Sequence, residues 1–273
     1  MEVERNFCIH GTTAQFPGYT LHGACVEMAK GVMEGFGKVH MEHVQLCPQS
    51  SDCIDESTLL ELQQSFPETR FRLHANVRID PILRIYDASR YSPKTRWYYE
   101  RLAELSVCMN APAYSLHAGY RDDACLQKMY DNVRTIQSFF SCPVIVEGMY
   151  PSERKDWLVR SWEEYAWLME SGLYYAIDLS HINILQKFYG CTEKGLLAEL
   201  LLHDNCKEIH LSYNFGNQDS HLQLSSKKYK QVWWREIWLS SMRKRQQKGL
   251  AIPTHFTEGR CAVLRPNKRS ISE

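Results

Sequence analysis

The sequence predicts a single (β/α)₈ barrel, and two observations carry this prediction. Short β-rich runs alternate with longer helical patterns, as in folds built on a parallel sheet, and the later units recur at intervals of roughly 30 residues. The length of 273 residues suits one such barrel, which typically takes roughly 250 residues. No linker or shift in composition divides the chain. We therefore expect one domain over 1–264 and a polar C-terminal tail over 265–273.

Eight runs rich in apolar and β-branched residues supply the expected strands. They lie at 6–10, 40–46, 71–79, 113–117, 143–147, 174–178, 208–211 and 252–258. Helical patterns lie at 19–36, 55–65, 96–105, 123–140, 157–171, 192–203 and 227–248. The second helix opens at a capping aspartate, Asp55, and two helices end near Gly37 and Gly172, because glycine can stop a helix in the left-handed conformation. Pro81 and Pro93 mark a long connection before the third helix.

The composition excludes some classes of protein. Hydrophobic residues make up 44% and charged residues 23% of the chain, so a sizeable core can form. Lys+Arg and Asp+Glu both total 32, which gives no overall attraction to nucleic acid or anionic membranes. The sequence shows no transmembrane run and no signal-peptide pattern. Its ten scattered cysteines contain no C-x-x-C pair. We therefore expect a cytoplasmic protein with mostly reduced thiols.

The placement of polar residues is the most informative feature. Six of the eight expected strands carry a residue able to bind metal at the carboxyl end of their apolar run. These residues are His74, His117, Glu147, Asp178, His210 and Glu258. A barrel gathers those ends on one rim, where its active sites are built. A cation held by several of them would offset the cost of burying their charge. Any one of them alone is more often a satisfied polar residue, but six at the same topological position predict a metal site.

Three further candidates follow closely along the chain. His181 lies three residues after Asp178, and Asp219 and His221 lie in the segment after the seventh strand. The set then holds five imidazoles and four carboxylates, more than one four-coordinate ion requires. This number predicts two or three ions with a carboxylate bridging between them.

At these residues the sequence resembles the superfamily of endonuclease IV-like and xylose isomerase-like barrels, which includes AP endonuclease family 2 and sugar phosphate isomerases and epimerases. In endonuclease IV the ligands run His, His, Glu, Asp-x-x-His, His, Asp-x-His, Glu. This chain supplies the same order as His74, His117, Glu147, Asp178-Leu-Ser-His181, His210, Asp219-Ser-His221 and Glu258. The similarity spans the third to eighth strands and is confined to these short motifs.

The resemblance implies three divalent ions, zinc first, with manganese or iron as alternatives. The first ion would be held by His74, His117 and Glu147. The second would share Glu147 as a bridge and take Asp178, His210 and Glu258. The third would be held by His181, Asp219 and His221. The sugar isomerases and epimerases are similar only at Glu147, Asp178, His210 and Glu258, which hold a single ion.

The loops beside these motifs depart from the endonuclease pattern. After His74 the chain reads Ala-Asn-Val-Arg and lacks the aromatic-Leu wedge that opens duplex DNA. After His117 it reads Ala-Gly-Tyr in place of Pro-Gly-Ser, and after His210 Leu-Ser-Tyr-Asn in place of Leu-Asn-Asp. These differences argue against an abasic-site endonuclease while leaving related chemistry open.

Three reactions fit this reading. In phosphoester hydrolysis, the first choice, Glu147, Glu258 and His181 would be catalytic and Arg260 would bind a phosphate, although a rim salt bridge explains Arg260 as well. In sugar isomerisation or epimerisation, one ion would suffice while Glu147 and Glu258 move a proton. The third is oxidation of a peptide or small molecule by two or three irons. The expected substrate is a phosphorylated or sugar-like small molecule or a nucleic acid; a binding module without catalysis is least favoured.

One segment could bind nucleic acid. The expected helix at 227–248 combines lysines and arginines with tryptophans, a mixture that suits nucleic-acid surfaces. We favour the alternative in which Val232, Trp233, Ile237 and Trp238 pack on the barrel and the charges remain in solvent.

Overall fold

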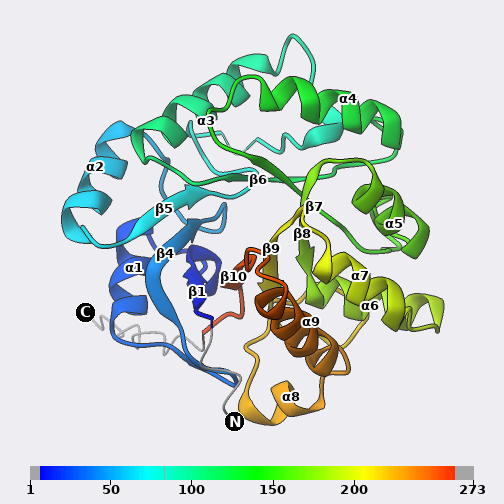
Figure 1. Cartoon of the computed structure of the whole chain (residues 1–273). Helices are drawn as coiled ribbons and strands as arrows, with labels where there is room; N and C mark the ends of the chain where they lie inside the picture. Colours follow the sequence, from blue (N-terminus) through cyan, green and yellow to red (C-terminus); the bar gives the residue numbers. More distant parts are fainter. Residues whose placement is uncertain (1–6, 83, 262–273) are drawn as a thin grey trace, which may run out of the picture.

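An eight-stranded sheet forms the centre of the computed structural model, which describes residues 7–82 and 84–261. The strand order is β5-β4-β1-β10-β9-β8-β7-β6, and every neighbouring pair is parallel. The sheet curls into a nearly closed barrel with the helices outside it (Figure 1). The strands are Ile9–Thr12 (β1), His40–Leu46 (β4), Arg70–Leu73 (β5), Tyr114–His117 (β6), Val144–Glu147 (β7), Tyr174–Asp178 (β8), Cys206–Leu211 (β9) and Thr254–Thr257 (β10). The predicted (β/α)₈ architecture is confirmed.

Helices follow the strands around the barrel. They are Leu21–Ala29 (α1), Glu56–Ser65 (α2), Arg96–Cys108 (α3), Leu126–Gln137 (α4), Trp162–Glu170 (α5), Leu179–Tyr189 (α6), Lys194–Leu202 (α7), Ser226–Gln231 (α8) and Arg235–Gln247 (α9). The Asp55 carboxylate caps α2 by accepting from the Thr58 backbone N–H at 2.8 Å, as expected. None of the described helices combines the length and apolar character needed to cross a bilayer.

Three local differences from the sequence-based expectation have identifiable causes. The first helix ends at Ala29, and a hairpin of Met33–Glu34 (β2) and Gly37–Lys38 (β3) follows, because Gly31 and Gly37 adopt left-handed backbone. The expected strand at 71–79 ends at Leu73, since Asn76 is left-handed, with φ 61°. The tail predicted at 265–273 lies outside the described residues.

The helix α6 was not expected. It begins directly after the last residue of β8, because the Asp178 carboxylate accepts the Ser180 backbone N–H at 2.6 Å and so caps the helix. No glycine, proline or loop segment therefore separates strand and helix in the sequence. As a result His181 lies in the first turn of a helix.

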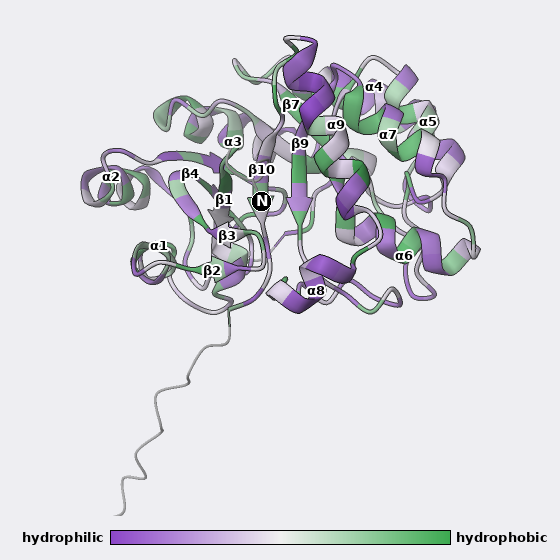
Figure 2. Cartoon of the chain, turned by 60° about the horizontal axis from the view of Figure 1, so that its bottom comes forward, coloured by the Kyte–Doolittle hydropathy of each residue, from purple (hydrophilic) through white to green (hydrophobic). Residues whose placement is uncertain are grey.

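The segment expected as one helix at 227–248 forms α8 and α9, with extended backbone at Val232 between them. Trp238 is buried, and Val232, Trp233 and Ile237 pack partly buried against the core, as the packing alternative predicts. Arg245 differs from that prediction, because it is buried and donates to the Leu201 and His203 carbonyls instead of remaining in solvent. Figure 2 shows that α8 is mostly hydrophilic.

The interior of the barrel is polar below its carboxyl rim. Side chains two residues apart on a strand point to the same face, so the residues two positions before rim residues line the interior. Glu208 lies there, and its carboxylate accepts hydrogen bonds from Gln45 Nε2 at 2.6 Å and Ser115 Oγ at 2.8 Å. It also pairs with the buried Arg72 guanidinium, which lies over the Phe256 ring at 4.4 Å. Barrel interiors are usually filled with branched apolar residues, so this ionic layer is a feature of this chain.

The β2–β3 hairpin buries a second carboxyl group, Glu34. Its Oε2 accepts the Leu224 backbone N–H at 2.8 Å, and its Oε1 lies 3.3 Å from Thr257 Oγ1. Burial, opposed by these two hydrogen bonds, raises the pKa of Glu34 to about 8.

We expect this group to make the folded protein less stable as pH rises. The pKa of Glu34 in the folded state lies above that of an unfolded glutamate, so the folded state binds more protons between about pH 5 and 8. The stabilisation that this proton provides is therefore lost as pH rises through that window. The free energy of unfolding should fall with a limiting slope of about 1.4 kcal/mol per pH unit. Urea unfolding of metal-free protein across this range measures it. Glu34→Gln should flatten the slope, whereas exposed Glu170→Gln should not; equal slopes in the wild type and Glu34→Gln would contradict the assignment.

Candidate metal centre

The predicted ligand residues meet at the carboxyl rim of the barrel. His117, Glu147 and Asp178 end β6, β7 and β8, and His74 and Glu258 directly follow β5 and β10. His210 lies near the end of β9, where it pairs in register with Asp178, and His117 pairs with Glu147. The loop after β9 brings Asp219 and His221 to the same rim.

A first group forms around one oxygen of Glu147. Glu147 Oε2 lies 3.5 Å from His74 Nε2 and 3.4 Å from His117 Nε2, and one ligand atom from each residue lies within 4.8 Å of the others. The Asn76 amide faces His117 Nδ1 at 3.4 Å and so helps orient this ring. These are the three residues expected to share the first ion.

A second group lies on the other oxygen of Glu147. His210 Nδ1 is 3.3 Å from Glu147 Oε1 and 3.4 Å from Glu258 Oε1. Asp178, His210 and Glu258 also offer ligand atoms within 4.8 Å of one another. Glu147 therefore presents one oxygen to each group, which is the geometry of a bridging carboxylate.

The third expected group is more open. Asp219 Oδ2 lies 2.7 Å from His221 Nε2 and 3.5 Å from His181 Nε2. His181 Nε2 is nearer to Asp178 Oδ2, at 3.3 Å, and these two residues form a compact set with Glu147. The structure therefore places His181 between the second and third groups.

Unpartnered buried atoms test whether these residues fit metal ions. Buried polar atoms normally have hydrogen-bond partners. Several rim atoms have none among the described residues: His74 Nδ1, Glu147 Oε2, Asp178 Oδ2, His210 Nδ1 and His221 Nδ1. Most of them face the space shared by the groups, and the donors are imidazole nitrogens and carboxylate oxygens, which suit zinc, manganese or iron. The residues present fit a multinuclear centre, while their role as ligands stays a prediction.

The charges of the rim favour bound protons when cations are absent. Burial lowers the pKa of His181, but the carboxylates of Asp178, Asp219 and Glu147 outweigh this effect and raise it to about 10. Burial raises the pKa of Asp178 to about 6. Because ligands bind metal without these protons, metal binding should release protons.

Glu208, which orients the His210 ring through a hydrogen bond, was not among the residues predicted from the sequence. Glu208 Oε1 lies 2.5 Å from His210 Nε2. Burial opposes its ionisation, but Arg72 and His210 keep the pKa of Glu208 below its usual range. An ionised acceptor places the proton of His210 on Nε2 and leaves Nδ1 free to face Glu147 and Glu258. The available signal was the Glu-x-His spacing, which puts both side chains on one face of a strand.

Arg260 lies beside the rim with its side chain exposed. Its backbone N–H donates to the His221 carbonyl at 2.8 Å. Within 7–82 and 84–261 its guanidinium makes no hydrogen bond or ion pair, so the rim salt bridge is absent there.

His221 itself has left-handed backbone, with φ 44°, a conformation that non-glycine residues adopt mainly at functional sites or turns.

The fold and the rim define a (β/α)₈ barrel with a His/carboxylate cluster where such barrels place their active sites. No protein-family model matches the chain, and no curated protein matches it. Solved structures do match, at 7% to 13% sequence identity. These comparisons establish the fold.

Three matched structures illustrate the similarity. A D-tagatose 3-epimerase-like protein matches with TM-score 0.60 and 13% identity, over 93% of this chain and 91% of its own. A 3-keto-D-glucoside 4-epimerase from E. coli matches with TM-score 0.56 and 12% identity, over 96% and 95%. An AP endonuclease of family 2 from Brucella melitensis matches with TM-score 0.55 and 7% identity, over 93% and 94%. The xylose isomerase-like and endonuclease-like fold inferred from the rim motifs is thus confirmed.

Proposed function

We propose that this chain is a metal-dependent enzyme with a di- or trinuclear centre at its carboxyl rim, and that it hydrolyses a phosphoester. The position of Glu147 carries the proposal, since its two oxygens face two separate groups of donors. A one-ion enzyme has no need of His74 and His117 on the far side of that carboxylate. The fold matches include both epimerases and an AP endonuclease, so the choice of hydrolysis rests on the donor set alone.

The rim residues would have different roles in hydrolysis. Bound ions would lower the pKa of a coordinated water and offset the charge of the phosphate. Glu258, buried between His210 and His221, is placed to accept a proton from the attacking water. His181 contacts the Gly148 carbonyl through Nδ1 at 2.9 Å and presents Nε2 to the centre. Arg260, exposed at the rim, would bind the phosphate.

Sugar isomerisation or epimerisation is the second candidate. One observation favours it: Glu147 and Glu258 both approach the same atom, His210 Nδ1, as two carboxylates sharing proton transfers around one ion would. Several matched structures are sugar epimerases. Iron-dependent oxidation and a cytoplasmic location stay predictions from the sequence.

Elemental analysis of protein purified without chelators separates these functions. We expect two or three zinc ions per chain at the rim, with any zinc held elsewhere in the chain counted separately, and hydrolysis of bis(4-nitrophenyl) phosphate. A single ion together with epimerisation of D-tagatose or D-fructose would overturn the hydrolase in favour of the second candidate. Two or three irons without hydrolysis would point to oxidation.

Replacing His221 with alanine provides a sharper test. Phosphodiester hydrolysis should fall by at least about 100-fold and one ion per chain should be lost, because His221 belongs to the third group. A single-ion epimerase would keep its metal and much of its rate. His22→Ala, on α1 beside Phe66, is the matched control and should change neither quantity.

A further inference from the structure

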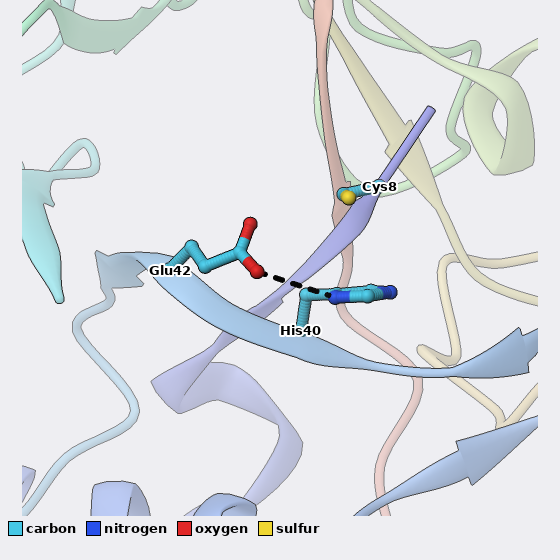
Figure 3. Close-up of side chains that lie close together, drawn as sticks. All are labelled: Cys8, His40 and Glu42. Atoms are coloured by element: carbon cyan, nitrogen blue, oxygen red, sulfur yellow. Dashed lines mark ion pairs between the residues drawn. The ribbon is translucent and has the colours of Figure 1, made fainter. Parts of the chain in front are cut away.

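A second set of metal-binding side chains lies at the opposite end of the barrel. Cys8 directly precedes β1, His40 is the first residue of β4, and Glu42 follows two residues later (Figure 3). Because the strands are parallel, these amino-terminal ends form the rim opposite the candidate centre. Figure 3 shows the Glu42 carboxylate directed toward the His40 ring, with the Cys8 sulfur coming from the neighbouring strand.

The three side chains are close enough to share one ion. One ligand atom from each lies within 4.8 Å of the others, and His40 Nδ1 is 3.7 Å from Glu42 Oε1. Ligand atoms around a tetrahedral zinc ion lie about 3.3 to 3.8 Å apart, given zinc–ligand bonds of roughly 2.0 to 2.3 Å. Small rotations of exposed side chains would therefore close the site.

The surroundings of these three residues provide a cavity and a fourth candidate ligand, His10. Cys8 and His40 both line a cavity of about 270 Å³ whose other walls include Phe36, Tyr229 and Trp238. The ring of His10, two residues after Cys8 on β1, lies 6.4 Å from that of His40. Its buried Nδ1 has no hydrogen bond among the described residues.

We propose that Cys8, His40 and Glu42 form a zinc site that fastens the beginning of β1 to the beginning of β4, separate from the rim centre. A thiolate beside an imidazole and a carboxylate favours zinc over magnesium or manganese. Residues at this end of a barrel serve stability more often than catalysis. The site is independent of the reaction proposed above.

Cobalt substitution tests the site because the two ends of the barrel have different donors. The nine rim residues offer only nitrogen and oxygen, so a thiolate-to-Co²⁺ charge-transfer band in the near ultraviolet must come from a cysteine. The full-length protein, stripped of metal and kept reduced with a phosphine, would be titrated with Co²⁺. We expect this band to saturate at one equivalent beyond the ions held by the rim.

Substitutions assign the band. Cys8→Ser should abolish it, and Glu42→Gln should weaken Co²⁺ binding there by at least about 10-fold. Cys108→Ser, at the exposed end of α3, is the matched control and should leave it unchanged. The visible bands of Co²⁺ at the rim should persist in every variant and show that each one folds. Absence of the charge-transfer band from the wild type, or its persistence in Cys8→Ser, would overturn the proposal.

Discussion

Substitution of Glu147 by glutamine is expected to empty much of the rim centre. The carboxylate is buried and offers one oxygen to His74 and His117 and the other to His210. An amide keeps the shape but carries no charge, and its NH₂ group would face cations and imidazoles. We expect the loss of at least one ion per chain and a fall in activity of more than about 100-fold, since even residues that merely support ligands account for 10- to 100-fold.

Metal content measured after gel filtration and the rate on bis(4-nitrophenyl) phosphate together check this expectation. Glu170→Gln, an exposed change on α5, is the matched control and should behave as wild type. Full metal content in Glu147→Gln would show that the two groups do not share this carboxylate. The metal readout stands even if the substrate is a sugar.

Glu208→Gln should damage both stability and metal binding. The variant leaves the Arg72 guanidinium buried without its counter-charge, and breaking a buried pair in this way costs about 3–5 kcal/mol. It also weakens the acceptor that orients His210, so metal affinity should fall by about 10- to 100-fold. Urea unfolding of metal-free protein measures the first effect, and competition with a metal indicator measures the second.

The double variant Arg72→Met with Glu208→Gln separates the two roles. Removing both charges eliminates the unpaired guanidinium, so stability should recover relative to the single variant. Metal affinity should stay low, because His210 still lacks its ionised partner. Recovery of metal affinity in the double variant would show that Glu208 acts only by neutralising Arg72. A single variant within about 1 kcal/mol of wild type would refute the buried pair itself.

Six of the nine rim donors could be predicted because each stands at the end of an apolar run, and strand ends converge in any parallel barrel. The same pattern says nothing about which donors share an ion. His181 illustrates this point. Its three-residue spacing from Asp178 matched the motif in which the histidine binds the third ion. Its Nε2, however, lies at similar distances from Asp178 of the second group and Asp219 of the third group. Such assignments depend on side-chain directions that spacing does not contain.

Other features escaped prediction because their partners are distant in sequence or their pattern is ambiguous. The Glu-x-His spacing puts Glu208 on the face of His210, but its counter-ion, Arg72 on β5, is distant in sequence and could not be inferred. The helix α6 begins directly after β8 with no glycine or proline between them, so the sequence offers no break that marks its start. The sequence predicts the end of a helix near Gly37, although Gly37 and Gly31 shape a hairpin.

The direct junction of β8 and α6 has a consequence for how this barrel could diversify. Asp178 ends the strand and caps the helix, and His181 rides on its first turn, so the offset between these two side chains is fixed by helical geometry. The loops after β5, β6 and β9 have no such restriction. A descendant of this chain could change the loops around the rim, while the offset between Asp178 and His181 would be inherited unchanged.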